Sequence, residues 1–367
     1  MNIKRIVSIA TAAVIAVSAA GFSAFAADSA DGVKINQKNF PDEYFRKYVA
    51  RHFDANYDGR LSTEEAESAT KIQVIDGKTK SLKGVEYFTE LEELLCHRLS
   101  LESLDLTGNT KLVRLSCEKN SIAKLDISKC AELKYIDCSR NQLTELDLSN
   151  NKKLRTLDCS ENQLDKLNVS KNPELVSLYC SYNGFKKLDI SKNTKLTALN
   201  CSYNSLTKLD VSKHTKFISL YCNYNQIEKL DLRKNKDLEN LDCSNNLLKE
   251  LDLSNNNKLR FLKCGSNNLT SLDVSKNSGM EWPPKSFERS VIFKCDSNEF
   301  SISAKVGDIY YLSELQKYGF DPKNARNWKG AEYDERTNSI KITEKTVTYL
   351  YDCTEGRIVK FTLITTA

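Results

Sequence analysis

The segment Leu154-Arg155-Thr156-Leu157-Asp158-Cys159-Ser160-Glu161-Asn162-Gln163-Leu164 decides the fold of this 367-residue chain. Its frame recurs with one cysteine every 21 residues, at Cys96, Cys117, Cys138, Cys159, Cys180, Cys201, Cys222, Cys243 and Cys264. Nine copies in one register exclude chance. Self-similarity at a fixed period of this length is typical of a solenoid, in which stacked repeats share one core.

The spacing inside the frame predicts a short β-strand in every repeat. Leu157 and Cys159 are two residues apart, so in an extended segment both point inward, while Asp158 between them points outward. Asn162 follows the strand, and its amide has the donors and the acceptor that a turning backbone needs. Successive strands should stack at about 4.8 Å. A repeat this short leaves little room for a helix, so extended or 3₁₀ segments are expected on the outer side.

The pattern L-x-x-L-x-C-x-x-N-x-L resembles that of leucine-rich-repeat proteins. The predicted fold class is therefore a leucine-rich-repeat solenoid, a curved horseshoe that is mostly β, with a parallel β-sheet on its concave face and few helices. An irregular first rung is predicted upstream from Ile72, Val74, Leu82, Val85 and Phe88.

The register continues beyond an apparent break after Asn277. The segment Phe293-Lys294-Cys295-Asp296-Ser297-Asn298 repeats Leu262-Lys263-Cys264-Gly265-Ser266-Asn267 at an offset of 31, which is one repeat plus ten inserted residues. Cys295 is then a tenth ladder cysteine. Because ten of the 12 cysteines occupy a position that usually holds leucine, they are interpreted as buried thiols that act as small hydrophobic side chains. All twelve are predicted to be reduced, including Cys130 and Cys353 outside the ladder.

The N-terminal segment has the composition of a secretory signal. Lys4 and Arg5 precede an apolar run, and Ala24-Phe25-Ala26 supplies the small residues that a signal peptidase needs. No later stretch approaches the roughly 18 continuous apolar residues of a membrane span. The chain is therefore predicted to be secreted, with non-covalent association with the cell surface as a further option. The formal charge of +5 does not by itself indicate a class of binding partner. The presence of only 3 histidines disfavours catalysis by histidine.

Residues 54–65, Asp-Ala-Asn-Tyr-Asp-Gly-Arg-Leu-Ser-Thr-Glu-Glu, fit the twelve-residue EF-hand calcium loop. The predicted ligands are Asp54, Asn56, Asp58, Arg60 through its carbonyl, Ser62 and Glu65. An entering helix is expected from Phe40, Tyr44, Phe45, Tyr48, Val49 and Phe53, and an exit helix from 63 to 70. Sensors use paired loops, so a single loop predicts a structural Ca²⁺ that stabilises the cap over the first rung.

Residues 300–367 lose the repeat. A short helix is expected within 305–320, and strands at 339–343, 346–351 and 357–364, with a turn at 354–356. The predicted organisation is a signal peptide at 1–26, a helical N-terminal cap with an EF-hand-like loop at 27–90, repeats at 91–299 with an insertion at 281–290, and a β-rich C-terminal cap at 300–367.

Over roughly residues 35–364 the chain resembles secreted bacterial leucine-rich-repeat proteins of the internalin-like kind. The resemblance implies a non-catalytic horseshoe that binds another macromolecule, often at a host or cell surface. The chain lacks the L-P-x-T-G signal for covalent attachment to the cell wall. The expected partner is an extracellular protein or glycan, without nucleic acid, and the chain is expected to be a monomer.

Two columns of outward-pointing positions are predicted to lie on the concave face, and they gather five tyrosines on four consecutive rungs. These candidate ligand-binding residues are Tyr179 and Tyr221 in one column and Tyr182, Tyr203 and Tyr224 in the other. Rigid amphipathic rings are frequent binding anchors for proteins or sugars. The alternative is that the rings only pair with one another along the sheet.

Charged columns complete the repeat. Lysines recur at 166, 187, 208 and 229 and at 171, 192 and 213, on the outer side past the Asn turn. They are interpreted as a solvated surface, with binding of an anionic glycan or wall polymer as the alternative. An aspartate column from Asp105 to Asp273 is interpreted as structural. Asp137 and Asp158, about 5 Å apart if on adjacent rungs, support an alternative function as a glycan-acting enzyme, and a structural spacer is a third option.

Overall fold

The computed structural model describes residues 32–277, 279–280, 292–294, 298–302, 304–353 and 358–365, which belong to one compact unit. The predicted signal peptide, the insertion at 281–290, Cys295 and the turn at 354–356 lie outside the described residues. Within the described part of the chain, no helix is long and apolar enough to cross a bilayer.

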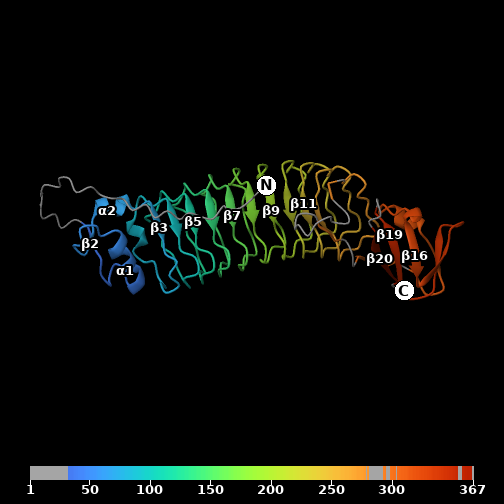
Figure 1. The fold of residues 1–367 in the computed structure, drawn as a ribbon, viewed down its shortest axis with the longest axis horizontal. Helices are drawn as coiled ribbons and strands as arrows, with labels where there is room; N and C mark the ends of the chain where they lie inside the picture. Colours follow the sequence, from blue (N-terminus) through green and yellow to red (C-terminus); the bar gives the residue numbers. More distant parts are fainter. Residues whose placement is uncertain are drawn as a thin grey trace, which may run out of the picture. The chain divides into compact units, whose positions relative to one another are not determined.

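The repeats form one parallel sheet of eleven strands whose order follows the sequence from β3 to β13. The strands are β3 (Lys71–Gln73), β4 (Glu93–Leu95), β5 (Arg114–Ser116), β6 (Tyr135–Asp137), β7 (Thr156–Asp158), β8 (Ser177–Tyr179), β9 (Ala198–Asn200), β10 (Ser219–Tyr221), β11 (Asn240–Asp242), β12 (Phe261–Lys263) and β13 (Ile292–Lys294). Figure 1 shows β3, β5, β7, β9 and β11 side by side. The predicted leucine-rich-repeat solenoid is confirmed.

The register matches the sequence frame at every rung. Leu157 of β7 pairs with Leu178 of β8, 21 residues further on. After the insertion, Leu262 of β12 pairs with Phe293 of β13, which confirms the offset of 31. β3 pairs with β4, so the irregular first rung also belongs to the sheet.

Each rung buries a fixed set of apolar side chains in one continuous core. In the rung that begins at Leu154 the set is Leu154, Leu157, Cys159, Leu164, Leu167 and Val169, all at most 8% exposed. Burial of a Leu-sized side chain contributes about 1.5–3 kcal/mol, so the stacking of rungs drives folding. The outer side consists of turns and bends, and the described repeats from 91 to 277 contain neither an α-helix, as expected, nor any of the 3₁₀ segments that were thought possible there.

The asparagine after each strand satisfies the backbone on two neighbouring rungs. The Asn162 amide donates to the carbonyls of Cys138 at 3.0 Å and Cys159 at 3.1 Å. Its Oδ1 accepts the N–H of Leu143 at 3.0 Å. This ladder is the predicted role of Asn162, repeated at every regular rung.

A second asparagine ladder runs through the turns on the other side of the coil. Its members are Asn109, Asn151, Asn172, Asn193, Asn235, Asn256 and Asn277, all fully buried. Asn172 donates to the carbonyls of Leu148 at 3.0 Å and Asn151 at 2.9 Å on the preceding rung. Cys130 and His214 replace asparagine in this ladder. His214 is 0% exposed, and its Nε2 lies 3.0 Å from the Ile190 carbonyl.

His214 should make the fold sensitive to mild acid. Burial lowers the pKa of His214 below its ordinary value of 6.5. Below pH 6.5 the His214 imidazole is therefore protonated in the unfolded chain but still neutral in the folded chain. The unfolding free energy consequently decreases as the pH falls below 6.5. His214→Asn should lose less unfolding free energy than the wild type between pH 7.5 and 5.5, as measured by urea denaturation. Asn235→His should lose more, and equal pH dependence in all three proteins would contradict this account.

The cysteine ladder agrees with the sequence except at Cys264. The ladder cysteines from Cys96 to Cys243, together with Cys130 and Cys353, are free and buried. Burial raises the pKa of Cys96 to about 12 and that of Cys130 to about 11. Cys264 is disulfide-bonded, so the prediction that every cysteine is reduced is wrong. Strand stacking holds equivalent Cα atoms about 4.8 Å apart, a separation that permits a disulfide, so burial in the ladder does not by itself keep a thiol reduced.

The N-terminal cap consists of β1 (Val33–Lys34), α1 (Glu43–His52), β2 (Arg60–Leu61), α2 (Thr63–Ser68) and the 3₁₀ turn η1 (Val85–Tyr87). Asp42 caps α1 by accepting the Phe45 N–H at 2.9 Å. Both predicted helices are present but shorter than expected: Phe40 and Phe53 lie outside α1 and still pack on the core, and α2 ends at Ser68. The predicted first-rung side chains Ile72, Val74, Leu82, Val85 and Phe88 are buried.

The C-terminal region forms two small sheets, with orders β14-β20-β19-β16 and β15-β18-β17. Its elements are β14 (Asn298–Ile302), β15 (Ile309–Tyr311), α3 (Ser313–Gln316), η2 (Pro322–Asn324), β16 (Ala325–Lys329), β17 (Ala331–Asp334), β18 (Ser339–Ile342), β19 (Thr346–Asp352) and β20 (Ile358–Thr365). The expected helix and three strands are present, and β14 to β17 were not anticipated. Tyr349 donates to the Thr270 carbonyl at 2.6 Å, so this region packs on the last rungs.

Candidate functional site

The predicted calcium loop has the backbone arrangement that its sequence requires. Asp54 is 6% exposed, and its carboxylate accepts the N–H groups of Asp58 and Gly59, each at 3.1 Å. Asn56 accepts the Asp58 N–H at 3.0 Å. Gly59 has a φ of +77°, where other residues are strained. The side chains at the first three predicted ligand positions are therefore drawn into one loop.

The exit side of the loop is anchored to the rest of the cap. Arg60 and Leu61 form β2, which pairs with β1, and Leu61 is buried beneath the loop. Glu65 accepts the N–H of Ala55 at 2.8 Å and that of Ser62 at 2.9 Å, so its carboxylate lies across the loop. The oxygen-only donor set fits Ca²⁺, which takes six to eight oxygens.

The carboxylates of the loop do not by themselves provide all the oxygen ligands of the predicted Ca²⁺ site. Among the described residues, no three His, Cys, Asp or Glu side chains gather closely enough to hold a metal ion by themselves. A bound Ca²⁺ would also need Asn56, Ser62 and the Arg60 carbonyl, and would compete with the backbone N–H groups that Glu65 now accepts. Calcium binding therefore stays a prediction.

Calcium should raise the stability of the cap. With a dissociation constant of about 10⁻⁴ M, 2 mM Ca²⁺ should add about 2 kcal/mol to the unfolding free energy. Adding Ca²⁺ to the chelated protein should therefore raise its Tm. Glu65→Gln, which removes the carboxylate expected to bind in bidentate fashion, should abolish the shift, whereas Glu67→Gln should keep it. A wild-type Tm that does not respond to Ca²⁺ would contradict a structural metal.

The structure brings the predicted tyrosines onto neighbouring rungs in two different settings. Tyr179 and Tyr221 end strands β8 and β10, with Asn200 of β9 between them. Tyr182, Tyr203 and Tyr224 lie beyond the strands, in the turns that follow. The chain turns immediately after each inward cysteine, so these three rings lie just past the strand ends, and their role as ligand-binding residues of the concave face stays a prediction.

Tyr182, Tyr203 and Tyr224 form one continuous ring stack, called here the tyrosine stack. The ring centroids of Tyr182 and Tyr203 are 4.0 Å apart with 10° between the planes, and those of Tyr203 and Tyr224 are 4.2 Å apart with 14°. Both end rings are nearly half exposed, at 49% for Tyr182 and 45% for Tyr224. The predicted stacking is confirmed, and the stack presents ring edges and hydroxyls to solvent.

Backbone geometry makes tyrosine an unfavourable choice at these positions. Tyr182, Tyr203 and Tyr224 have φ values of 53°, 53° and 54°. The same left-handed conformation occurs in every rung of this column, at Lys119, Arg140, Glu161, Asn245 and Ser266. Asparagine and glycine tolerate this region, whereas for other residues it costs about 1–3 kcal/mol. The positive φ is therefore a property of the repeat that every rung shares, and the three tyrosines differ from the other rungs in their stacked rings.

The hydroxyls of the stack interact electrostatically. A hydrogen bond with the Tyr182 side chain raises the pKa of Tyr203, and one with Tyr203 raises that of Tyr224. Beside the stack, burial and then the Asp242 carboxylate raise the pKa of Tyr221. The raised pKa values of Tyr203, Tyr221 and Tyr224 keep these three hydroxyls neutral and able to donate hydrogen bonds.

The carboxylates of the alternative enzymatic function lie on adjacent strands. Asp137 of β6 pairs with Asp158 of β7. Burial, opposed by hydrogen bonds from Ser160, raises the pKa of Asp158, and the Asp137 charge raises it further. Asp137 accepts the Ser139 hydroxyl at 2.7 Å, and Asp158 accepts the Ser160 N–H at 2.9 Å. Both carboxylates are thus bound to their own turns.

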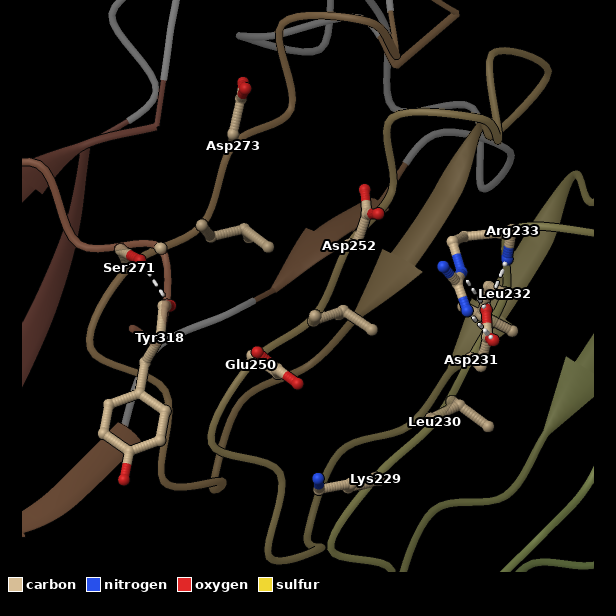
Figure 2. Close-up of a pocket in the computed structure, with 13 residues that line it drawn as sticks. Lys229, Leu230, Asp231, Leu232, Arg233, Glu250, Asp252, Ser271, Asp273 and Tyr318 are labelled. Carbon is tan, nitrogen blue, oxygen red and sulfur yellow. Dashed lines mark hydrogen bonds and ion pairs between the residues drawn. The ribbon is translucent and has the colours of Figure 1, made fainter. Parts of the chain in front are cut away.

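A pocket of about 640 Å³ lies at the last regular rungs. Figure 2 shows its wall of Asp231 on one rung and Glu250 and Asp252 on the next, with Tyr318 of the C-terminal region on the other side. Ser271 donates to the Tyr318 carbonyl at 3.4 Å across this junction. Sequence reasoning missed the pocket because it depends on where the C-terminal region packs.

The aspartate column has the predicted structural role. Asp189 accepts the Ser191 N–H at 2.9 Å, and Asp210 accepts the Ser212 N–H at the same distance. These hydrogen bonds lower the pKa of both carboxylates. Each aspartate therefore closes its own turn.

The chain is similar in fold to solved leucine-rich-repeat proteins. No protein-family model matches it, and no curated protein does so either. An internalin (InlF) from Listeria monocytogenes is 22% identical over 75% of this chain and 87% of its own, with a TM-score of 0.59. The functional domain of InlJ from Listeria monocytogenes, described as including a cysteine ladder, is 24% identical over 92% of this chain and 99% of its own, with a TM-score of 0.38. At these identities, the similarity to InlF shows the fold alone.

Proposed function

We propose that this chain, which has the leucine-rich-repeat fold of the internalin structures, is a secreted, non-catalytic module that binds another protein through its concave side. The observation that carries the proposal is the tyrosine stack, in which three rings on consecutive rungs lie 4.0 and 4.2 Å apart and the end rings are nearly half exposed. Tyrosine is also among the residues that dominate the binding energy of protein interfaces.

The ring geometry favours a protein over a glycan as the ligand. Because Tyr203 lies between two parallel rings at 4.0 and 4.2 Å, both of its faces are covered. A sugar ring that stacks on an aromatic residue needs a free face, which only the ends of the stack offer. Edges and hydroxyls remain available, and these suit the mixed apolar and hydrogen-bonded contacts of a protein surface.

Two N-terminal segments of the chain support the same function in different ways. The apolar N-terminal run predicts export. A calcium-bound loop would cover the apolar end of the first rung outside the cell, where its ligands Asp54, Asn56, Asp58, Ser62 and Glu65 would stay loaded at millimolar Ca²⁺. Ca²⁺ would supply charge neutralisation for these carboxylates and no chemistry on the ligand.

Arrays of extracellular proteins and of glycans, probed with the mature protein in 2 mM Ca²⁺, test this function. We expect reproducible binding to a protein, and weaker binding to the same protein by Tyr203→Ala. Tyr179→Ala, which leaves the stack intact, is the matched variant and should retain more affinity. Binding only to glycans, or binding that Tyr203→Ala leaves unchanged, would overturn the proposal.

A further inference from the structure

Two columns of lysines occupy four consecutive rungs on the outer part of the coil. We call them the lysine strip: Lys166, Lys187, Lys208 and Lys229 in one column, and Lys171, Lys192, Lys213 and Lys234 in the other. Seven of these, all but Lys234, were noted from the sequence, and all eight are exposed. Across the described residues none of the eight forms an ion pair.

A neighbouring column shows how this fold neutralises repeated charge. Positions 90, 111, 132, 153, 174 and 195 alternate glutamate with lysine, so each lysine finds an acid one rung away. Lys153 lies 2.6 Å from Glu132, and Lys195 lies 2.6 Å from Glu174. Lys111 pairs with Glu90, and Lys258 with Asp237, in the same way. The 21-residue repeat can therefore place an acidic residue one rung away from each lysine. The lysines of the strip have no such partner.

Acidic residues mark the ends of one lysine column. Glu145 precedes Lys166 by one repeat, and Glu250 follows Lys229 by one repeat. Figure 2 shows Lys229 and Glu250 along the wall of the pocket at the last rungs. Four rungs at about 4.8 Å span about 14 Å between the first and last lysine. The strip is therefore a finite basic surface rather than a general property of the solenoid.

Acidic residues inside the strip offset only part of its charge. Between its two columns lie Asp189, Asp210 and Asp231. Asp189 and Asp210 accept hydrogen bonds within their own turns. Asp231 pairs with Arg233 at 2.6 Å. Eight exposed lysines without an ion pair therefore outnumber the three aspartates between their columns, and this surface carries an excess of positive charge.

We propose that the lysine strip binds a linear polyanion that carries phosphate or sulfate groups, independently of the protein ligand of the tyrosine stack. Lysine ammonium groups bind such oxyanions as point charges and adapt to a flexible chain. Successive lysines on one column lie one rung, or about 4.8 Å, apart, which lets closely spaced charges on one polymer contact several of them. Binding releases the counterions condensed on the polymer.

The composition of the strip disfavours nucleic acid. Single strands are held by aromatic rings that stack on bases, together with basic grooves. None of the eight positions of the strip is aromatic, and the neighbouring Arg233 forms an ion pair with Asp231. The recognised feature is therefore the row of oxyanions rather than a base.

Affinity for fluorescent inorganic polyphosphate at 50 and 150 mM salt tests the proposal, with heparin as a second probe. The test variant is Lys187→Gln/Lys192→Gln/Lys208→Gln/Lys213→Gln. We expect it to lose about a hundredfold in affinity at 150 mM salt, and its plot of log affinity against log salt to flatten by about 3, since each lost contact removes about 0.7. Tighter binding of polyphosphate or of heparin identifies phosphate or sulfate as the preferred group.

A matched control removes the same charge from the ion-paired column. Lys111→Gln/Lys153→Gln/Lys195→Gln/Lys258→Gln should change the affinity by no more than about threefold. Equal losses in both variants would show that net charge alone binds the polymer and would overturn the proposal. So would a wild-type protein that binds neither probe at 50 mM salt, or one that binds oligo(dT) or anionic vesicles more tightly. Thermal unfolding of each variant checks the fold, and the Tyr203→Ala variant should bind polyphosphate normally.

Discussion

Replacing Asn246 with alanine is expected to lower the unfolding free energy by about 3–5 kcal/mol, because one buried side chain satisfies backbone groups on two rungs. Asn246 is 5% exposed. Its amide donates to the carbonyls of Cys222 at 3.0 Å, Cys243 at 3.1 Å and Ser244 at 3.2 Å, and its Oδ1 accepts the Ile227 N–H at 3.0 Å. Alanine leaves these groups buried and water cannot replace the amide.

Urea denaturation followed by circular dichroism measures this loss. Asn150 provides the control, because it is exposed and donates a single hydrogen bond, to the Ser128 carbonyl at 3.1 Å. Asn150→Ala should lower the unfolding free energy by less than about 1 kcal/mol. Similar losses in the two variants would show that the asparagine ladder does not hold the rungs together.

Replacing all three rings of the tyrosine stack with alanine is expected to weaken protein binding at least a hundredfold, since truncation of a central hot-spot residue costs about 2 kcal/mol or more. The Tyr182→Ala/Tyr203→Ala/Tyr224→Ala variant should still fold, because the rings lie outside the core. The substitutions also remove none of the backbone hydrogen bonds between rungs. The backbone N–H of Tyr203, for example, donates to the Asn223 carbonyl at 2.9 Å whatever the side chain.

Surface plasmon resonance against the captured protein gives the affinities, and thermal unfolding verifies the fold. Tyr57→Ala/Tyr311→Ala is the matched control, because both rings are exposed, at 83% and 56%, and lie outside the repeats. This control should bind like the wild type. A triple variant that is folded and keeps its affinity would remove the tyrosine stack from the binding site.

The sequence determines the repeating part of the fold almost completely, because one hydrophobic period dictates both the strand and its partner. The pairing of Leu157 with Leu178, and even that of Leu262 with Phe293 across the insertion, follows from spacing alone. The inward set is fixed by alternation, and Asn162 has the contacts that its amide predicts.

Other features depend on geometry that spacing does not encode. The placement of Tyr182 in a turn at φ 53° requires knowledge of where each three-residue strand ends. The disulfide at Cys264 could not be distinguished from the ladder thiols, since all share one repeat position. The pocket beside Tyr318 and the four unanticipated strands β14 to β17 depend on non-repeating C-terminal packing.

Oxidative footprinting of tyrosines with and without the protein partner tests the central claim most directly. Hydroxyl radicals label exposed rings, so Tyr57 at 83% exposure provides an internal reference in the same molecule. The account predicts that the partner strongly reduces labelling of Tyr182 and Tyr224, the exposed ends of the stack, and leaves Tyr57 unchanged. Protection confined to other parts of the chain, with Tyr182 and Tyr224 labelled as in the free protein, would contradict it.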